Sequence, residues 1–243
     1  MREAYERTRR GAILYDADML AQVSDAAFTA AAWDAAESVT GTFKSAGRGN
    51  TLFLRKGQSE FALRRYLRGG LIGRLVREHY LWLGENSTRA FAEFRLLAKL
   101  NALGLPVPLA AAARYVRRGP LYTADILTVR VPRIRSLSDR LTASPADAQF
   151  WQRLGNGICR FHHAGVFHAD LNVSNVQLDE ADSLCLLDFD RGRLLPAGPW
   201  QQRNLARFHR SLRRLKQFNP AVNFSERDWN QFLKGYFDAS RLA

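Results

Sequence analysis

His168–Asn175, with the sequence HADLNVSN, is the stretch that decides the fold of this chain and the chemistry it carries. It sets Asp170 and Asn175 five positions apart, and Asp188 follows at the end of a second apolar run. Phosphoryl transfer needs groups in this order: a carboxylate that accepts a hydroxyl proton, then an amide oxygen and another carboxylate that hold magnesium against ATP. The pattern therefore predicts a phosphoryl-transfer site that uses ATP and Mg²⁺.

The segments around this stretch predict a helix, a loop and a hairpin. Apolar residues recur with helical spacing from Phe150 to Phe161, and Ala164-Gly165 ends that helix, so the motif lies on a loop just after a buried helix. Two short strands at 176–178 and 184–187 form a hairpin that returns Asp188 toward the loop. The three polar residues are therefore expected to gather in one small volume.

Each of these residues has a predicted role. Alone, an aspartate five residues before an asparagine is usually a turn, but helix, loop and hairpin agree for the ordered set. We expect Asp170 to orient and deprotonate the acceptor hydroxyl. Asn175 and Asp188 are expected to be metal ligands, because Mg²⁺ prefers hard oxygen atoms and takes few protein ligands. His168 is expected to brace the loop by hydrogen bonding rather than to act as the base.

The formal charge of +13 concerns the partners of the chain. Between Arg191 and Asn219 there are eight Lys or Arg residues and no Asp or Glu. Nucleic acid, an anionic membrane or phosphorylated lipid, and a merely soluble basic protein all fit this composition, but no ordinary nucleic-acid-binding motif accompanies it. Four arginines recur at helical spacing and form a cationic stripe: Arg203, Arg207, Arg210 and Arg214. The stripe is predicted either to dock on an anionic lipid or sugar or to be a solvated basic face.

The chain is expected to stay in the cytoplasm. Its longest apolar runs, such as 105–113, are broken by prolines and fall far below the roughly 20 residues that span a bilayer. The first residues are polar and lack the apolar core of a secretory signal.

The N-terminal half predicts an accessory segment followed by strands. An Ala-rich pattern over 25–39 predicts a helix, and the stretches 51–55 and 60–66 predict two strands joined by a tight turn. A helix is expected over 88–103 and a further strand over 121–131. The last of these strands runs into Pro132, and we place the change of lobe there, with a first lobe at 1–131 and a second lobe at 132–243.

The catalytic stretch resembles the loop H-x-D-L-x-x-x-N of the protein-kinase-like superfamily, with Asp188-Phe189-Asp190 in the place of D-F-G. More narrowly, the chain is similar to the lipopolysaccharide kinases, above all those that act on 3-deoxy-D-manno-octulosonic acid (Kdo). The similarity runs from about Gly41 to Lys216 and includes the segments 63–70 and 204–212. It implies an α+β, bilobal protein-kinase-like fold with a small β-rich N-terminal lobe and a mainly helical C-terminal lobe.

The resemblance also implies nucleotide-binding residues in the first lobe. Gly47 and Gly49 fall where a phosphate-covering loop is expected, although a plain hairpin turn explains them as well. Phe61-Ala62-Leu63-Arg64 aligns with V-A-I-K, so Ala62 falls at the adenine contact and Arg64 at the phosphate-binding lysine, with Arg65 and Lys56 as alternative cations. Glu93 resembles the acidic partner of that cation, or it is an ordinary exposed helix carboxylate.

By the same resemblance, the chain is expected to transfer the γ-phosphate of ATP to the 4-hydroxyl of a Kdo residue on lipid A. It would act as a peripheral protein at the cytoplasmic face of the bacterial inner membrane, with a Kdo-lipid A glycolipid and an anionic membrane surface as partners. A different sugar kinase, such as a lipopolysaccharide heptose kinase, and a non-catalytic protein that binds nucleotide or nucleic acid are the alternatives.

Overall fold

The computed structural model describes residues 1–39, 51–67 and 79–241, which fall into two compact units. The first unit contains Met1–Lys99 and Pro108–Arg130, and the second contains Leu100–Val107 and Val131–Ala243. Helix α1 (Arg89–Ala102) begins in the first unit and ends in the second. Each unit has its own core and is described by itself.

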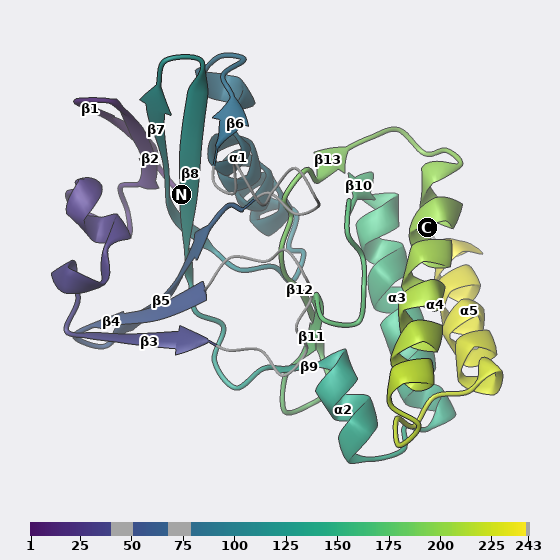
Figure 1. Cartoon of the computed structure of the whole chain (residues 1–243). Coiled ribbons are helices and arrows are strands. Elements are labelled where there is room, and N and C mark those ends of the chain that lie inside the picture. The colour runs from purple at the N-terminus through teal and green to yellow at the C-terminus, as the bar shows by residue number, and fades with distance from the viewer. Residues whose placement is uncertain (40–50, 68–78, 242–243) are drawn as a thin grey trace. The chain divides into compact units, whose positions relative to one another are not determined.

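An antiparallel sheet of eight described strands forms the first unit (Figure 1). Its order is β1-β2-β7-β8-β5-β4-β3, and β6 pairs with β8. The strands are β1 (Glu3–Thr8), β2 (Gly11–Asp16), β3 (Ala35–Val39), β4 (Thr51–Lys56), β5 (Ser59–Arg65), β6 (Tyr80–Leu81), β7 (Ala110–Arg118) and β8 (Leu121–Val129). The strands predicted at 51–55, 60–66 and 121–131 are present as β4, β5 and β8, whereas β1, β2 and β7 were not predicted.

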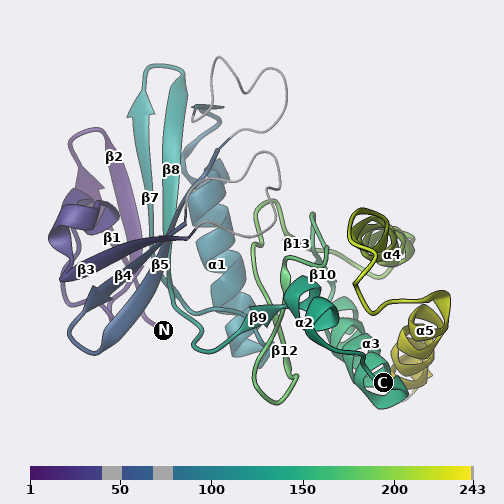
Figure 2. The same cartoon turned by 60° about the horizontal axis from the view of Figure 1, so that its bottom comes forward.

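The sheet of the first unit is covered on both faces (Figure 2). On β7, Tyr115 packs against Phe91 of α1 with ring centroids 5.3 Å apart. The neighbouring Arg114 lies over Phe28, with its guanidinium carbon 4.6 Å from the ring centroid. Because successive side chains of a strand point to opposite faces, α1 covers one face and the segment around Phe28 covers the other.

The helix predicted over 25–39 is wrong. The segment instead forms the short 3₁₀ turns η1 (Asp25–Phe28) and η2 (Ala30–Ala32) and the strand β3, which pairs with β4. Phe28 is buried in the sheet core, and the ring of Trp33 lies 5.2 Å from that of Phe61. Pairing and burial against the sheet therefore override the helical preference of the alanines.

Four helices dominate the second unit (Figure 1). They are α2 (Leu137–Ala143), α3 (Ala148–His163), α4 (Trp200–Phe218) and α5 (Glu226–Arg241). Asp147 caps α3 by accepting a hydrogen bond from the backbone N–H of Phe150 at 2.7 Å, which satisfies one of the donors left open at a helix start. Within the described ranges, no helix combines the length and the apolar character needed to cross a bilayer.

Short strands in the second unit support the loop predicted to carry the chemistry. They are β9 (Arg135–Ser136), β10 (Val166–Phe167), β11 (Val176–Leu178), β12 (Leu184–Leu186) and β13 (Arg193–Leu194). The predicted hairpin is present as β11 and β12, and β9 adds to the other edge of β11. The loop 168–175 therefore lies between β10 and β11, and Asp188 lies just after β12.

Helices α3 and α5 approach each other closely in the second unit. A Cβ atom added at Gly155 would lie 2.1 Å from the carbonyl oxygen of Phe232, and one added at Gly235 would lie 2.1 Å from that of Gln152. Only glycine, which has no Cβ atom, fits at these two crossing points. Nearby, Trp151 and Phe232 are fully buried.

Candidate active site

The loop 168–175 is shaped by its own side chains. The Asn172 Oδ1 atom accepts hydrogen bonds from the backbone N–H groups of Ser174 and Asn175 at 2.9 and 3.1 Å. The side-chain amides of Asn172 and Asn175 both donate to the carbonyl oxygen of Asp170, at 3.1 and 2.9 Å. Asparagine readily forms such local turns, so the sequence N-V-S-N itself fixes the position of Asp170 relative to Asn175.

His168 holds this loop to the strand end that precedes Asp188. Its Nδ1 atom accepts a hydrogen bond from the backbone N–H of Asp170 at 3.2 Å, and its Nε2 atom donates to the carbonyl oxygen of Leu187 at 3.0 Å. A ring that accepts at one nitrogen and donates at the other is neutral. The predicted bracing role of His168 is confirmed.

Asp188 lies at a turn where its backbone has a positive φ angle. Its φ angle is 63°, in the left-handed region that aspartate tolerates better than most residues. The N–H of Leu187 donates to the carbonyl oxygen of Asn175 at 2.9 Å, which ties the two predicted metal ligands together through the backbone. Phe189 is buried, with its ring centroid 4.8 Å from that of His168. The aromatic residue thus anchors the turn that presents Asp188.

The chemistry of these residues fits magnesium. In the described part of the chain, no three His, Cys, Asp or Glu side chains are grouped as a metal cluster. Mg²⁺ in phosphoryl-transfer sites does not need such a cluster, because it is bound by one or two carboxylates together with substrate phosphates and water. Asn175 is only 3% exposed, and its amide nitrogen is held by the carbonyl of Asp170, so its oxygen is the end that suits a cation.

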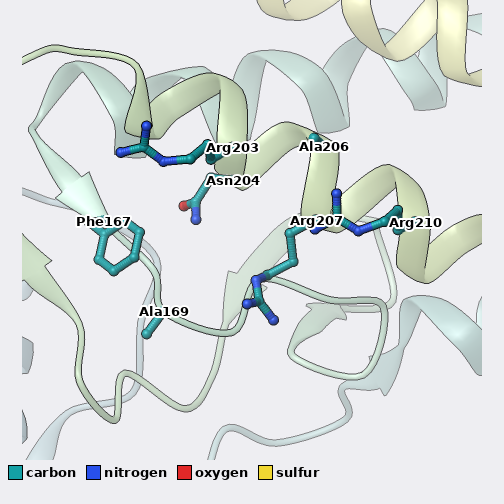
Figure 3. Close-up of a pocket in the computed structure, with 7 residues that line it drawn as sticks. All are labelled: Phe167, Ala169, Arg203, Asn204, Ala206, Arg207 and Arg210. Atoms are coloured by element: carbon teal, nitrogen blue, oxygen red, sulfur yellow. The ribbon is translucent and has the colours of Figure 1, made fainter.

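Helix α4 holds the loop at three successive points along one of its faces. Asn204 donates to the carbonyl oxygen of His168 at 2.9 Å and accepts from its N–H at 3.3 Å. Arg207 lies 3.2 Å from the Oδ1 atom of Asp170, and Ser211 accepts from the N–H of Val173 at 3.2 Å. Figure 3 shows Asn204 and Arg207 directed from the helix toward the loop. These contacts hold the backbone of the loop to α4 and place Arg207 beside the predicted base.

The sequence did not predict these roles for α4. Segment 204–212 contributes only to the family resemblance, and the spacing of Arg207 predicts only that it belongs to the cationic stripe. The arginines of the stripe have different surroundings in the structure. Arg207 pairs with Asp170, whereas Arg214 lies over the ring of Phe218. The available signal was the spacing of Asn204, Arg207 and Ser211, which places them on one helix face.

The first unit brings together two other predicted residues, Arg64 and Glu93. The Nη2 atom of Arg64 lies 2.6 Å from both carboxylate oxygens of Glu93, and the Tyr66 hydroxyl donates to the same carboxylate at 2.5 Å. Glu93 is 3% exposed, so its charge is compensated inside the unit. Strand alternation places Ala62 on the same face of β5 as Arg64.

The alternative cations lie elsewhere. Arg65 points to the opposite face of β5, where it pairs with Asp125 at 2.9 Å, and Lys56 is exposed at the end of β4. Arg64 is therefore the one of the three that faces Glu93. Gly47 and Gly49 lie outside the described residues. The nucleotide-binding roles of Gly47, Gly49, Ala62, Arg64 and Glu93 stay predictions.

The site consists of an aspartate and an asparagine five residues apart, held on a braced loop of a helical unit. Phosphotransferases with a protein-kinase-like fold use this arrangement. A family model described as "Lipopolysaccharide kinase (Kdo/WaaP) family" matches residues 31–236. The chain belongs to this family, and it is an α+β phosphotransferase that acts on a hydroxyl group.

Similar curated proteins carry one name, 3-deoxy-D-manno-octulosonic acid kinase. The protein from Xylella fastidiosa (strain 9a5c) is 40% identical over 233 residues, which cover 95% of this chain and 91% of that protein. The protein from Xanthomonas euvesicatoria pv. vesicatoria (strain 85-10) is 43% identical, with 93% and 89% covered. The protein from Vibrio parahaemolyticus is 37% identical, with 89% and 90% covered.

Proposed function

We propose that this chain transfers the γ-phosphate of ATP to the 4-hydroxyl of a Kdo residue on lipid A during lipopolysaccharide core synthesis. The observation that carries the proposal is the loop 168–175, in which Asp170 and Asn175 are fixed by hydrogen bonds and by helix α4. The choice of acceptor is supported by relatives that are named Kdo kinases and share 37–43% of their residues with this chain.

Asp170 is the catalytic base of the proposed reaction. Its carboxylate is 41% exposed and lies at the surface of the second unit, where an acceptor can reach it. It accepts the proton of the sugar hydroxyl while the hydroxyl oxygen forms a bond to the γ-phosphorus and the bond from that phosphorus to the bridging oxygen of ADP breaks. Arg207 pairs with this carboxylate at 3.2 Å and favours one orientation of it, and orientation is a large part of catalysis in reactions of this kind.

The remaining roles concern ATP and its metal. Asn175 and Asp188 would hold Mg²⁺, which when bound neutralises charge on the phosphates of ATP. Arg64, positioned by Glu93, contacts phosphate oxygens through its planar guanidinium group, and Ala62 leaves room for the adenine. In this proposal the first lobe binds the nucleotide, and Gly47 and Gly49, which lie outside the described residues, would belong to a phosphate-covering loop.

The protein is proposed to work as a peripheral protein at the cytoplasmic face of the inner membrane. Its acceptor is anchored there by acyl chains, while ATP is supplied from the cytoplasm. The net charge of +13 favours attraction to an anionic bilayer and to a phosphorylated glycolipid. Vesicles with and without anionic lipid, sedimented with the protein at low and high salt, measure this attraction.

A direct assay tests the proposed reaction. The protein is incubated with Mg-ATP and lipid A precursors that carry Kdo, lack Kdo, or carry Kdo extended with heptose, and the products are examined by mass spectrometry. The expected product is a Kdo-bearing lipid with one added phosphate on the Kdo 4-hydroxyl. Phosphate on heptose alone, or no phosphate on any Kdo acceptor, would contradict the proposal. Asp170→Asn should abolish turnover without loss of the folded state.

A further inference from the structure

An open pocket lies beside the catalytic loop, entirely within the second unit (Figure 3). It holds about 370 Å³, enough for part of a sugar residue. Its lining comes from the end of β10, from the loop and from α4: Phe167, Ala169, Arg203, Asn204, Ala206, Arg207 and Arg210. The pocket is therefore built from the same elements that fix the orientation of Asp170.

The pocket has a strongly positive lining. Three of its seven lining residues are arginines and none is acidic. Arg203 and Arg210 form no ion pair with any residue that the structure describes, and both are exposed. Arg207 is already paired with Asp170 at 3.2 Å, so the positive charge of Arg203 and Arg210 is the part that an anion in the pocket would compensate. Their planar N–H forks match a carboxylate, which two parallel hydrogen bonds can hold.

The position of the pocket beside Asp170 determines which anionic group of the acceptor can bind in it. Arg207 lines the pocket and also lies 3.2 Å from the Oδ1 atom of Asp170, so a group bound there is close to the hydroxyl that Asp170 activates. In Kdo the carboxylate is attached to the second carbon and the reacting hydroxyl to the fourth carbon of the same ring. The phosphates of lipid A lie on a different sugar and so farther from that hydroxyl along the acceptor.

We propose that Arg203, Arg207 and Arg210 form a subsite for the carboxylate of the acceptor sugar acid and thereby select an acidic sugar over a neutral one. This assignment rests on the proposed function. Ala169 and Ala206 contribute only methyl groups to the lining, which keeps the pocket open between the arginines. The subsite acts in acceptor binding, while Asp170 acts in the transfer step.

Ala206 offers a test that leaves every arginine in place. Ala206→Glu places a carboxylate in the pocket, one helical turn before Arg210, where helix folding tolerates an acid–base pair. Losing a charge-assisted hydrogen bond corresponds to roughly a 10- to 100-fold loss in affinity. The KM for the Kdo acceptor should rise by about that factor, whereas kcat and the KM for ATP should stay near their original values. Ala206→Gln, of the same size but neutral, is the matched control and should change the acceptor KM by no more than about twofold.

The arginines give a second, independent comparison. Arg203→Gln and Arg210→Gln should each raise the acceptor KM by roughly tenfold, since each removes one fork from the subsite. Arg214→Gln is the control, because Arg214 belongs to the same helix and the same predicted stripe but does not line the pocket. An equal effect of all three substitutions would overturn the subsite and indicate a nonspecific charge effect.

Changing the acceptor tests the ligand chemistry. In one experiment, the carboxylate of the Kdo acceptor is converted to a carboxamide. With the unmodified chain, the KM for this acceptor should be raised by the same factor as Ala206→Glu raises the KM for the natural acceptor, and Ala206→Glu should not raise it further. Free Kdo should bind to the full chain without nucleotide, as followed by NMR chemical shifts, and its carboxamide should not.

The outcomes separate the two proposals. If the unmodified chain phosphorylates no Kdo acceptor, the proposed function fails. If it phosphorylates the carboxylate and the carboxamide equally well, only the subsite is overturned. Loss of vesicle binding in Arg203→Gln without loss of carboxylate selectivity would also overturn it, and would assign the pocket to lipid phosphate instead.

Discussion

Asn204 should be the residue of α4 on which the catalytic loop depends most. It is 2% exposed, and it makes two hydrogen bonds to the backbone of His168, which is also 2% exposed. Asn204→Ala removes both partners and leaves a backbone N–H and a backbone carbonyl buried without them. The side chain lost is small, so the unsatisfied polar groups dominate the effect.

The magnitude follows from these two bonds. Each buried group left without a partner costs roughly 1–3 kcal/mol, and the 3.3 Å bond to the N–H belongs near the lower end. The free energy of unfolding should therefore fall by about 2–5 kcal/mol. The carbonyl of His168 belongs to the peptide that leads to Asp170, so the proposed base loses its position. A misplacement on the order of 1 Å lowers kcat by roughly 100-fold.

Urea unfolding and steady-state kinetics measure the two effects separately. Gln202→Ala is the control, because Gln202 is exposed on the same helix. Asn204→Asp keeps the acceptor but sets a carboxylate oxygen against the carbonyl of His168, so it should be at least as harmful as Asn204→Ala. If Asn204→Ala unfolds at the original urea concentration and keeps its kcat, α4 does not hold the loop. A loss of stability with unchanged kcat would refute the positioning role alone.

Three further predictions concern stability. Burial lowers the pKa of His162 from 6.5 to about 4, so the unfolded chain takes up a proton in this range that the folded chain excludes. The contribution of neutral, buried His162 to the free energy of unfolding is fully present above pH 6.5 and is lost as the pH falls toward 4, by about 2 kcal/mol between pH 7 and pH 5. Urea titrations at several pH values should show this loss, and His162→Gln should remove it. Gly235→Ala should force α3 and α5 apart and cost about 1–3 kcal/mol or more, against no change for the exposed Lys234→Ala, by thermal unfolding. Arg64→Met should cost roughly 3–5 kcal/mol because it leaves Glu93 charged and buried, and the addition of Glu93→Leu should recover part of that loss; a double variant no more stable than the single one would show that the pair is not coupled.

Local chemistry was the part of the molecule that the sequence predicted well. The turn-forming asparagines and His168 act within a few residues of Asp170, so their spacing in the chain already contains their geometry. The long helices α3 and α4 and the pair β4–β5 also follow from apolar periodicity and turn residues. In each case the decisive interactions are close in sequence.

The predictions that failed or were missing depend on distant partners. The segment 25–39 contains good helix formers, but Phe28 and Trp33 are buried against strands that come later in the chain. Arg207 and Asp170 are 37 positions apart, and a helical arginine stripe has the same spacing whether it faces solvent or a loop. The run of alanines in β7 has no alternation, because both of its faces are buried.

The segment Leu100–Val107 has a consequence for any attempt to divide this enzyme. The chain crosses between its two units at Lys99–Leu100, at Val107–Pro108 and again at Arg130–Val131. A fragment that starts at residue 132 lacks Pro106, whose carbonyl oxygen accepts a hydrogen bond from the N–H of Leu186 at 3.0 Å, two residues before Asp188. Exchange of a lobe with a relative therefore requires three junctions, because a single junction at 131/132 would leave Leu100–Val107 with the first unit.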